Sequence, residues 1–162
     1  MPQVKLFAYA IPFRDLAPVV DDWRERTCTS KPSHGVPPHV TLLIPAPPDL
    51  DGAVAALTDF SPFDVSFRSF ARFPGTLWLA PEPPEPFVAM TEALARQFPD
   101  HLPYEGMFAT ITPHLTVAQG DNLDEAAAAL TNRLPLRSRA FSVVLFEQVA
   151  PDRWREAAEL TL

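Results

Sequence analysis

The sequence contains the same four-residue pattern twice, as Pro38-His39-Val40-Thr41 and as Pro113-His114-Leu115-Thr116. Aliphatic residues follow each copy, which is typical of a β-strand. Because residues two apart in a strand point to the same face, we expect the His and Thr of each copy to project side by side, about 6.5 Å apart. The intervening Val40 or Leu115 then points into a core. Each copy would present one imidazole and one hydroxyl to the same surface.

Chance is a poor explanation for this repetition. A shuffled chain of this composition would contain about 0.03 copies of Pro-His-x-Thr. A structural alternative is that each His is a satisfied core residue and each Thr simply favours a strand; two matched copies argue against it. The copies lie 75 residues apart in a chain of 162. A duplicated unit would relate them by a pseudo-two-fold axis and place both His-Thr pairs across one cleft.

The pattern of apolar residues predicts an α+β fold. Alternating residues predict strands at 4–13, 39–44, 109–119, 139–149 and 153–162, and a hairpin over 63–79. Helical spacing predicts helices capped by Asp15 and Asn122, with two more over 49–60 and 87–98. Loops over 27–38 and 99–106 carry His34 and His101, which we expect to be solvated. We therefore expect antiparallel sheets flanked by helices around a central cleft.

One segment divides the two copies of the motif. Residues 81–86 include four prolines, which predict a stiff, extended stretch that is unable to join a sheet. It separates a first motif half of about 1–80 from a second of about 81–162, whose closing strands could return to the first lobe. Each half alone is small for a good core. We therefore expect a single bilobal domain over 1–162.

Charge and cysteine content limit the partners. The net charge of −7 argues against long duplex nucleic acid, which is bound through many Lys and Arg contacts to phosphate. A small phosphorylated nucleotide or a single RNA end remains compatible with it. The lone Cys28 can form no internal disulfide, which fits a reducing cytoplasm. No run of 18 apolar residues predicts a membrane span. We expect a cytoplasmic monomer.

Two facing histidines suit acid–base chemistry. An imidazole has an ordinary pKa near 6.5, so at neutral pH one ring can be neutral while its partner is protonated. The neutral ring can accept a proton from an attacking hydroxyl or water, and the protonated ring can give one to a leaving oxygen. The two threonine hydroxyls are donors that can hold phosphate oxygens between the rings. This set suits displacement at a phosphodiester, and it requires neither metal nor cofactor.

These residues resemble the two-histidine (2H) phosphoesterase superfamily, and within it the bacterial 2′-5′ RNA ligase-like proteins. The resemblance includes the run Phe73-Pro74-Gly75-Thr76-Leu77-Trp78, similar to that family's central hairpin, and the ending from Leu145 to Leu160. It implies a bilobal fold and hydrolysis of 2′,3′-cyclic phosphates to 2′-phosphates, with 2′-5′ RNA ligation as the reverse reaction. By the same resemblance, His39 and His114 are the acid–base pair, and Thr41 and Thr116 hold the phosphate. The near-symmetric motifs do not assign acid and base.

Other substrate contacts and other functions stay open at this point. Arg68 and Arg72 could contact substrate, and Trp78 could stack on a base or belong to the hairpin core. A metal site at His39 and His114 is a weaker alternative, because Thr is a poor metal ligand and no Asp, Glu or Cys recurs at a fixed offset. A non-catalytic module that binds nucleotides or RNA ends in the same cleft is the stronger alternative.

Overall fold

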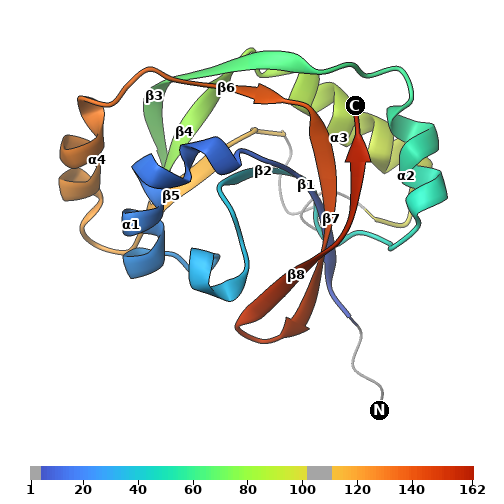
Figure 1. Ribbon diagram of the computed structural model, residues 1–162, viewed down its shortest axis with the longest axis horizontal. Helices are drawn as coiled ribbons and strands as arrows, with labels where there is room; N and C mark the ends of the chain where they lie inside the picture. The colour runs from blue at the N-terminus through green and yellow to red at the C-terminus, as the bar shows by residue number, and fades with distance from the viewer. Residues whose placement is uncertain (1–4, 102–110) are drawn as a thin grey trace.

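The computed structural model describes residues 5–101 and 111–162. Within them the chain forms two four-stranded antiparallel sheets, with strand orders β2-β1-β7-β8 (the first sheet) and β5-β4-β3-β6 (the second sheet), as Figure 1 shows. The strands are β1 (Phe7–Pro12), β2 (His39–Leu43), β3 (Phe63–Phe73), β4 (Thr76–Glu82), β5 (Leu115–Gln119), β6 (Leu136–Ala140), β7 (Ser142–Ala150) and β8 (Arg153–Thr161). The expected α+β fold with antiparallel sheets is confirmed.

Helices cover the two ends of the molecule. They are α1 (Ala17–Thr27), α2 (Leu50–Leu57), α3 (Glu85–Gln97) and α4 (Leu123–Thr131). Figure 1 shows α1 and α4 at one end and α2 and α3 at the other. Contacts agree with this arrangement, since α3 packs on β2 whereas α1 packs on β5. None of the helices in the described residues is both long and apolar enough to cross a lipid bilayer.

Each sheet draws its strands from both parts of the sequence. The hairpin β3–β4 precedes the second motif half, yet β4 pairs with β5 and β3 pairs with β6. Conversely, β7 and β8 come last in the chain and join the first sheet through the pairing of β7 with β1. As a result, the two motif strands, β2 and β5, lie at corresponding edges of the two sheets.

Alternation along the motif strands follows the expected pattern. Val40 and Leu115 are fully buried in a hydrophobic core that both sheets share. Their neighbours Thr41 and Thr116 are only half-buried and face the other way. The core face of each motif strand therefore fixes which side chains the opposite face presents.

Two strand predictions need correction. The prolines of 81–86 do not all lie outside the sheet, because β4 continues through Pro81, which pairs with Phe67 of β3. The pairing of β4 with β5 stops at Leu79, so at Pro81 one edge of β4 is unpaired. Proline lacks a backbone N–H, and this is tolerated on an unpaired edge. The single strand predicted over 139–149 is two strands in different sheets. A break of one exposed residue, Phe141, separates β6 from β7. The residues that face the main core are Leu136 and Ala140 before it and Val143 and Leu145 after it, so the core-facing positions shift by one residue there.

Neither predicted cap makes a capping hydrogen bond, although Asn122 has the predicted position. Asn122 stands at the N-cap position of α4 but makes no capping hydrogen bond, and Asp15 lies in a short 3-10 turn before α1. The Asp15 carboxylate instead accepts a hydrogen bond from the Ser138 hydroxyl at 2.7 Å. Asp49 is a true cap, and its side chain accepts from the Gly52 amide. The second motif strand begins at Leu115, later than expected, and its predicted residues 109 and 110 lie outside the described residues.

Gly35 joins the loop before the first motif to the last strand. Its φ of +88° lies in the left-handed region, and a Cβ there would overlap the carbonyl oxygen of Trp154. We expect Gly35→Ala to lower the free energy of unfolding by a few kcal/mol, from backbone strain plus this overlap. Chemical denaturation measures the change.

Gly75 offers a matched control. Its φ of +72° is equally unusual, but nothing lies within 4 Å of an added Cβ. Gly75→Ala should therefore cost only the conformational strain of about 1 kcal/mol. Equal destabilisation by the two substitutions would show that the approach of Gly35 to Trp154 is not a constraint.

Candidate active site

The two motifs meet at one cavity of about 170 Å³. His39 and Thr41 reach it from β2, and His114 and Thr116 reach it from β5 and the residue just before it. The strands contact each other directly across the two sheets. The remaining lining residues are Arg24, Cys28, Ser30, Ile44 and Gln119. The structure thus brings together the four residues singled out by the repeated pattern.

A backbone carbonyl orients each imidazole in the same way. His39 Nδ1 lies 2.9 Å from the Pro37 carbonyl oxygen, and His114 Nδ1 lies 2.8 Å from that of Thr112. A carbonyl can only accept, so Nδ1 carries the proton in both rings. In the neutral rings Nε2 is then the unprotonated nitrogen. The duplicated motif therefore supplies two imidazoles prepared to exchange protons through Nε2.

Burial disfavours protonation of both imidazole rings. It lowers the pKa of His39 to about 4, with a smaller lowering from Arg24 and His114 that the Pro37 carbonyl opposes. Burial also lowers the pKa of His114, against the opposing effect of the Thr112 carbonyl. At neutral pH both rings are thus neutral, contrary to the expectation of one neutral and one protonated ring. That expectation used the ordinary pKa, which does not include desolvation.

Arg24 distinguishes the surroundings of His39. Its guanidinium is almost fully buried, and Nη1 donates to the Asp21 carboxylate at 2.6 Å. Nη2 donates to the carbonyl oxygens of Ser30, Val36 and Pro37 at 2.9–3.2 Å. The Pro37 carbonyl is also the acceptor for His39 Nδ1. Arg24 therefore holds the loop before the first motif and, through it, the orientation of His39.

Phe73 and Trp78 pack against His114, whereas the ring near His39 is Phe146, with centroids 6.3 Å apart. Phe73 meets the His114 ring edge-on with centroids 5.0 Å apart, and Trp78 does so at 5.8 Å. Trp78 is itself only 7% exposed, and its partner across the strands is Thr116. Trp78 does not line the cavity and supports His114 from the side.

The two predicted arginines lie elsewhere. Arg68 and Arg72 are exposed residues of β3 that pair with Glu82 at 3.2 Å and with Asp124 at 2.5 Å. Neither is among the described residues that line the cavity. His34 is also outside it, with Nδ1 3.4 Å from the Thr29 carbonyl oxygen.

Gln119 and Cys28 complete the wall of the cavity. The Gln119 side-chain oxygen accepts from the Thr29 amide at 2.7 Å, so the loop after α1 is tied to β5. Burial raises the pKa of Cys28, which keeps it a thiol and a weak nucleophile. In residues 5–101 and 111–162, no group of three His, Cys, Asp or Glu side chains is placed to hold a metal ion.

Sequence reasoning missed Arg24, Ser30, Ile44 and Gln119 as lining residues. An arginine on an amphipathic helix is usually solvated, and no local spacing distinguishes Arg24 from its neighbours Arg26 and Lys31. These contacts depend on residues far apart in the chain.

The lowered pKa of His39 predicts a pH dependence of stability. In the unfolded chain the imidazole of His39 binds a proton below about pH 6.5, whereas in the folded protein it does so only below about pH 4. Lowering the pH between these two values therefore favours unfolding. We expect wild-type protein to lose about 1 kcal/mol more than His39→Gln between about pH 7 and pH 5, after discounting for contact of the ring with solvent in the cavity. Urea titrations of both proteins at the two pH values test this. Parallel losses would contradict it.

A protein-family model, the 2′-5′ RNA ligase superfamily, matches residues 12–150, which include both His-x-Thr motifs. No curated protein matches the chain. Among solved structures, the TT0787 protein of Thermus thermophilus is 19% identical with a TM-score of 0.63, and 98% of each chain is covered. E. coli LigT complexed with 3′-AMP is 16% identical with a TM-score of 0.59 and 99% coverage of each chain.

These two structural neighbours are distant in sequence and show the fold alone. The family model spans most of the chain, and the residues it matches include both motif strands and all the residues that line the cavity. The chain belongs to the 2′-5′ RNA ligase superfamily of two-histidine phosphoesterases.

Proposed function

We propose that the protein is a metal-independent phosphodiesterase that hydrolyses 2′,3′-cyclic phosphates of nucleotides or RNA ends to 2′-phosphates. The observation that carries the proposal is the pair of imidazoles in one cavity, each with Nδ1 bound to a carbonyl and each accompanied by a threonine. This arrangement provides two proton-transfer groups and two hydroxyl donors for one phosphate. Reversal of the reaction is 2′-5′ ligation of RNA.

The reaction needs one proton on the pair. A bound phosphate carries negative charge, which raises the pKa of a neighbouring imidazole and restores one protonated ring. The neutral ring takes a proton from water through Nε2 as the water oxygen bonds to phosphorus. The protonated ring gives its proton to O3′ as the O3′–phosphorus bond breaks, leaving a 2′-phosphate. Thr41 and Thr116 donate to the oxygens on which charge develops.

Membership of the superfamily supports activity on phosphodiester bonds. The E. coli LigT structures are described as complexes with 3′-AMP, NADP+ and ATP, which supports a small nucleotide as the ligand of this cavity. The net charge of −7 fits a ligand held by a few local groups better than a long polyanion.

Substitution of either histidine tests the mechanism. We expect His39→Ala and His114→Ala each to lower kcat for adenosine 2′,3′-cyclic phosphate by about 10²–10⁴-fold, because each removes one proton transfer. Thr41→Ala and Thr116→Ala should lower kcat less, since each removes one of two donors. His34→Ala is the matched control outside the cavity.

The same variants distinguish an enzyme from a non-catalytic nucleotide-binding protein. An enzyme loses turnover in the His variants while product binding, measured by calorimetry, survives within about tenfold. Wild-type protein that binds nucleotides but hydrolyses no cyclic phosphate would support the binding module. Activity that chelator abolishes would contradict the metal-independent mechanism.

The lowered pKa values also predict the pH profile. The free enzyme is competent with one proton on the pair, and the pKa of His39 is about 4 while that of His114 is also below its ordinary value. The profile of kcat/KM should therefore be bell-shaped with its maximum below about pH 6.5, so that activity rises as pH falls from about 8 to 6.5. A maximum above about pH 7 would contradict the assignment.

A further inference from the structure

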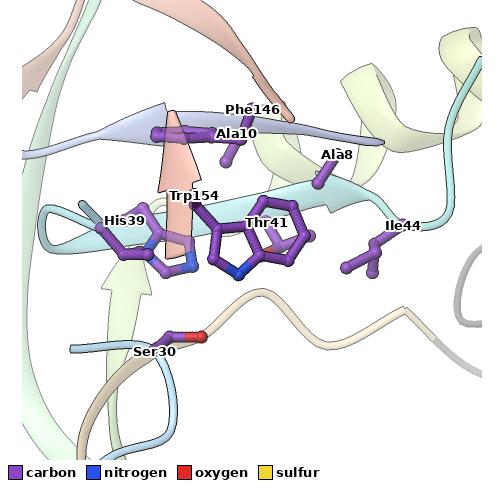
Figure 2. Close-up of a pocket in the computed structure, with 9 residues that line it drawn as sticks. Ala8, Ala10, Ser30, His39, Thr41, Ile44, Phe146 and Trp154 are labelled. Atoms are coloured by element: carbon purple, nitrogen blue, oxygen red, sulfur yellow. The ribbon is translucent and has the colours of Figure 1, made fainter. Parts of the chain in front are cut away.

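A recess adjoins the catalytic cavity on the side of the first sheet. It shares His39, Thr41, Ser30 and Ile44 with that cavity, whereas His114 and Thr116 line only the cavity. The residues that belong to the recess alone are Ala8, Ala10, Val36, Phe146 and Trp154. Figure 2 shows Trp154 beside Thr41, with Ala8 and Ala10 on the neighbouring strand. The recess is apolar except where it meets the catalytic residues.

Strand register explains the shape of the recess. Ala8 of β1 pairs with Phe146 of β7. Ala10 pairs with Thr41 of β2, on the opposite edge of β1. These residues alternate with core residues such as Tyr9, so their side chains leave the opposite face of the sheet. Two adjacent small side chains on β1 leave a depression between Thr41 and the aromatic residues of β7 and β8. Larger residues at 8 and 10 would fill it.

Trp154 forms one side of this depression. Its side chain packs against the small cluster of Ala10, Val144 and Phe146, yet it remains half-exposed. Its backbone pairs with Gln148 of β7, and Gly35 lies close to its carbonyl oxygen. A large flat aromatic surface is thus held in place next to the catalytic pair without taking part in proton transfer.

We propose that this recess seats the nucleobase of the substrate, stacked on Trp154, while the cyclic phosphate lies between the two His-x-Thr motifs. The inference rests on the proposed function and narrows the substrate to nucleoside cyclic phosphates. An apolar recess with an indole wall suits a flat heterocycle, and stacking accepts every base because each has a π-face. We therefore expect the recess to accept any of the nucleobases.

Paired substrates with and without a base test the recess. We expect Trp154→Ala to lower kcat/KM for adenosine 2′,3′-cyclic phosphate by about 5–150-fold, the loss of one base–aromatic stack. Methyl riboside 2′,3′-cyclic phosphate has the same reacting group and no base, so its kcat/KM should change less than about twofold. Trp154→Phe should restore much of the loss. Phe141→Ala removes an exposed aromatic residue outside the recess and is the control.

The outcomes separate the recess from the proposed function. Equal loss with both substrates would assign Trp154 a structural role and overturn the inference. If no cyclic phosphate is hydrolysed, the recess is tested by binding instead. Calorimetry then compares the affinities for adenosine 2′-monophosphate and methyl riboside 2′-phosphate. Tighter binding of the adenosine compound that Trp154→Ala removes would support the recess while the proposed function fails. Binding unaffected by Trp154→Ala, or no binding by wild-type protein, would overturn the inference.

Discussion

Alternation along two edge strands is the constraint on which this site depends. The residue between each His and Thr, Val40 or Leu115, is fully buried in the shared core. That burial leaves the His and Thr no orientation except toward the opposite face, because a strand has a period of two. A shift of either strand by one residue would bury the polar pair and expose the core residue. The stability of the core thus specifies the geometry of the two His-Thr pairs.

Equal motifs do not have equal surroundings. Both imidazoles donate Nδ1–H to the carbonyl two residues earlier, a local feature that each copy repeats. Beyond that bond the surroundings differ, since the carbonyl beside His39 also accepts from buried Arg24 whereas His114 packs against Phe73 and Trp78. The apolar recess adds a further difference, because it opens only on the His39 side. The repeated motif therefore produces a site whose two sides differ.

Desolvation links the architecture to the chemistry. Packing two imidazoles into one small cavity lowers the pKa of both, so both rings are neutral at neutral pH before substrate binds. In the proposed reaction an anionic phosphate reverses this effect, because its charge stabilises a protonated imidazole. Binding of that substrate would also prepare the acid. Neither imidazole needs a carboxylate partner, since a backbone carbonyl already fixes its tautomer.

Local sequence patterns were sufficient to identify the four groups His39, Thr41, His114 and Thr116, their orientation and the α+β fold, because alternation and short motifs are local properties. They could not assign strands to sheets, since the residues on both sides of Phe141 favour a strand although the chain there passes from one sheet to the other. Arg24 and Trp154 gain their positions from contacts with residues distant in sequence, and Asp15 bonds Ser138 where local rules predicted a cap. The sequence around a residue specifies which face of the strand its side chain takes. Tertiary packing decides which side chains surround it in space, and therefore its pKa and its hydrogen-bond partners.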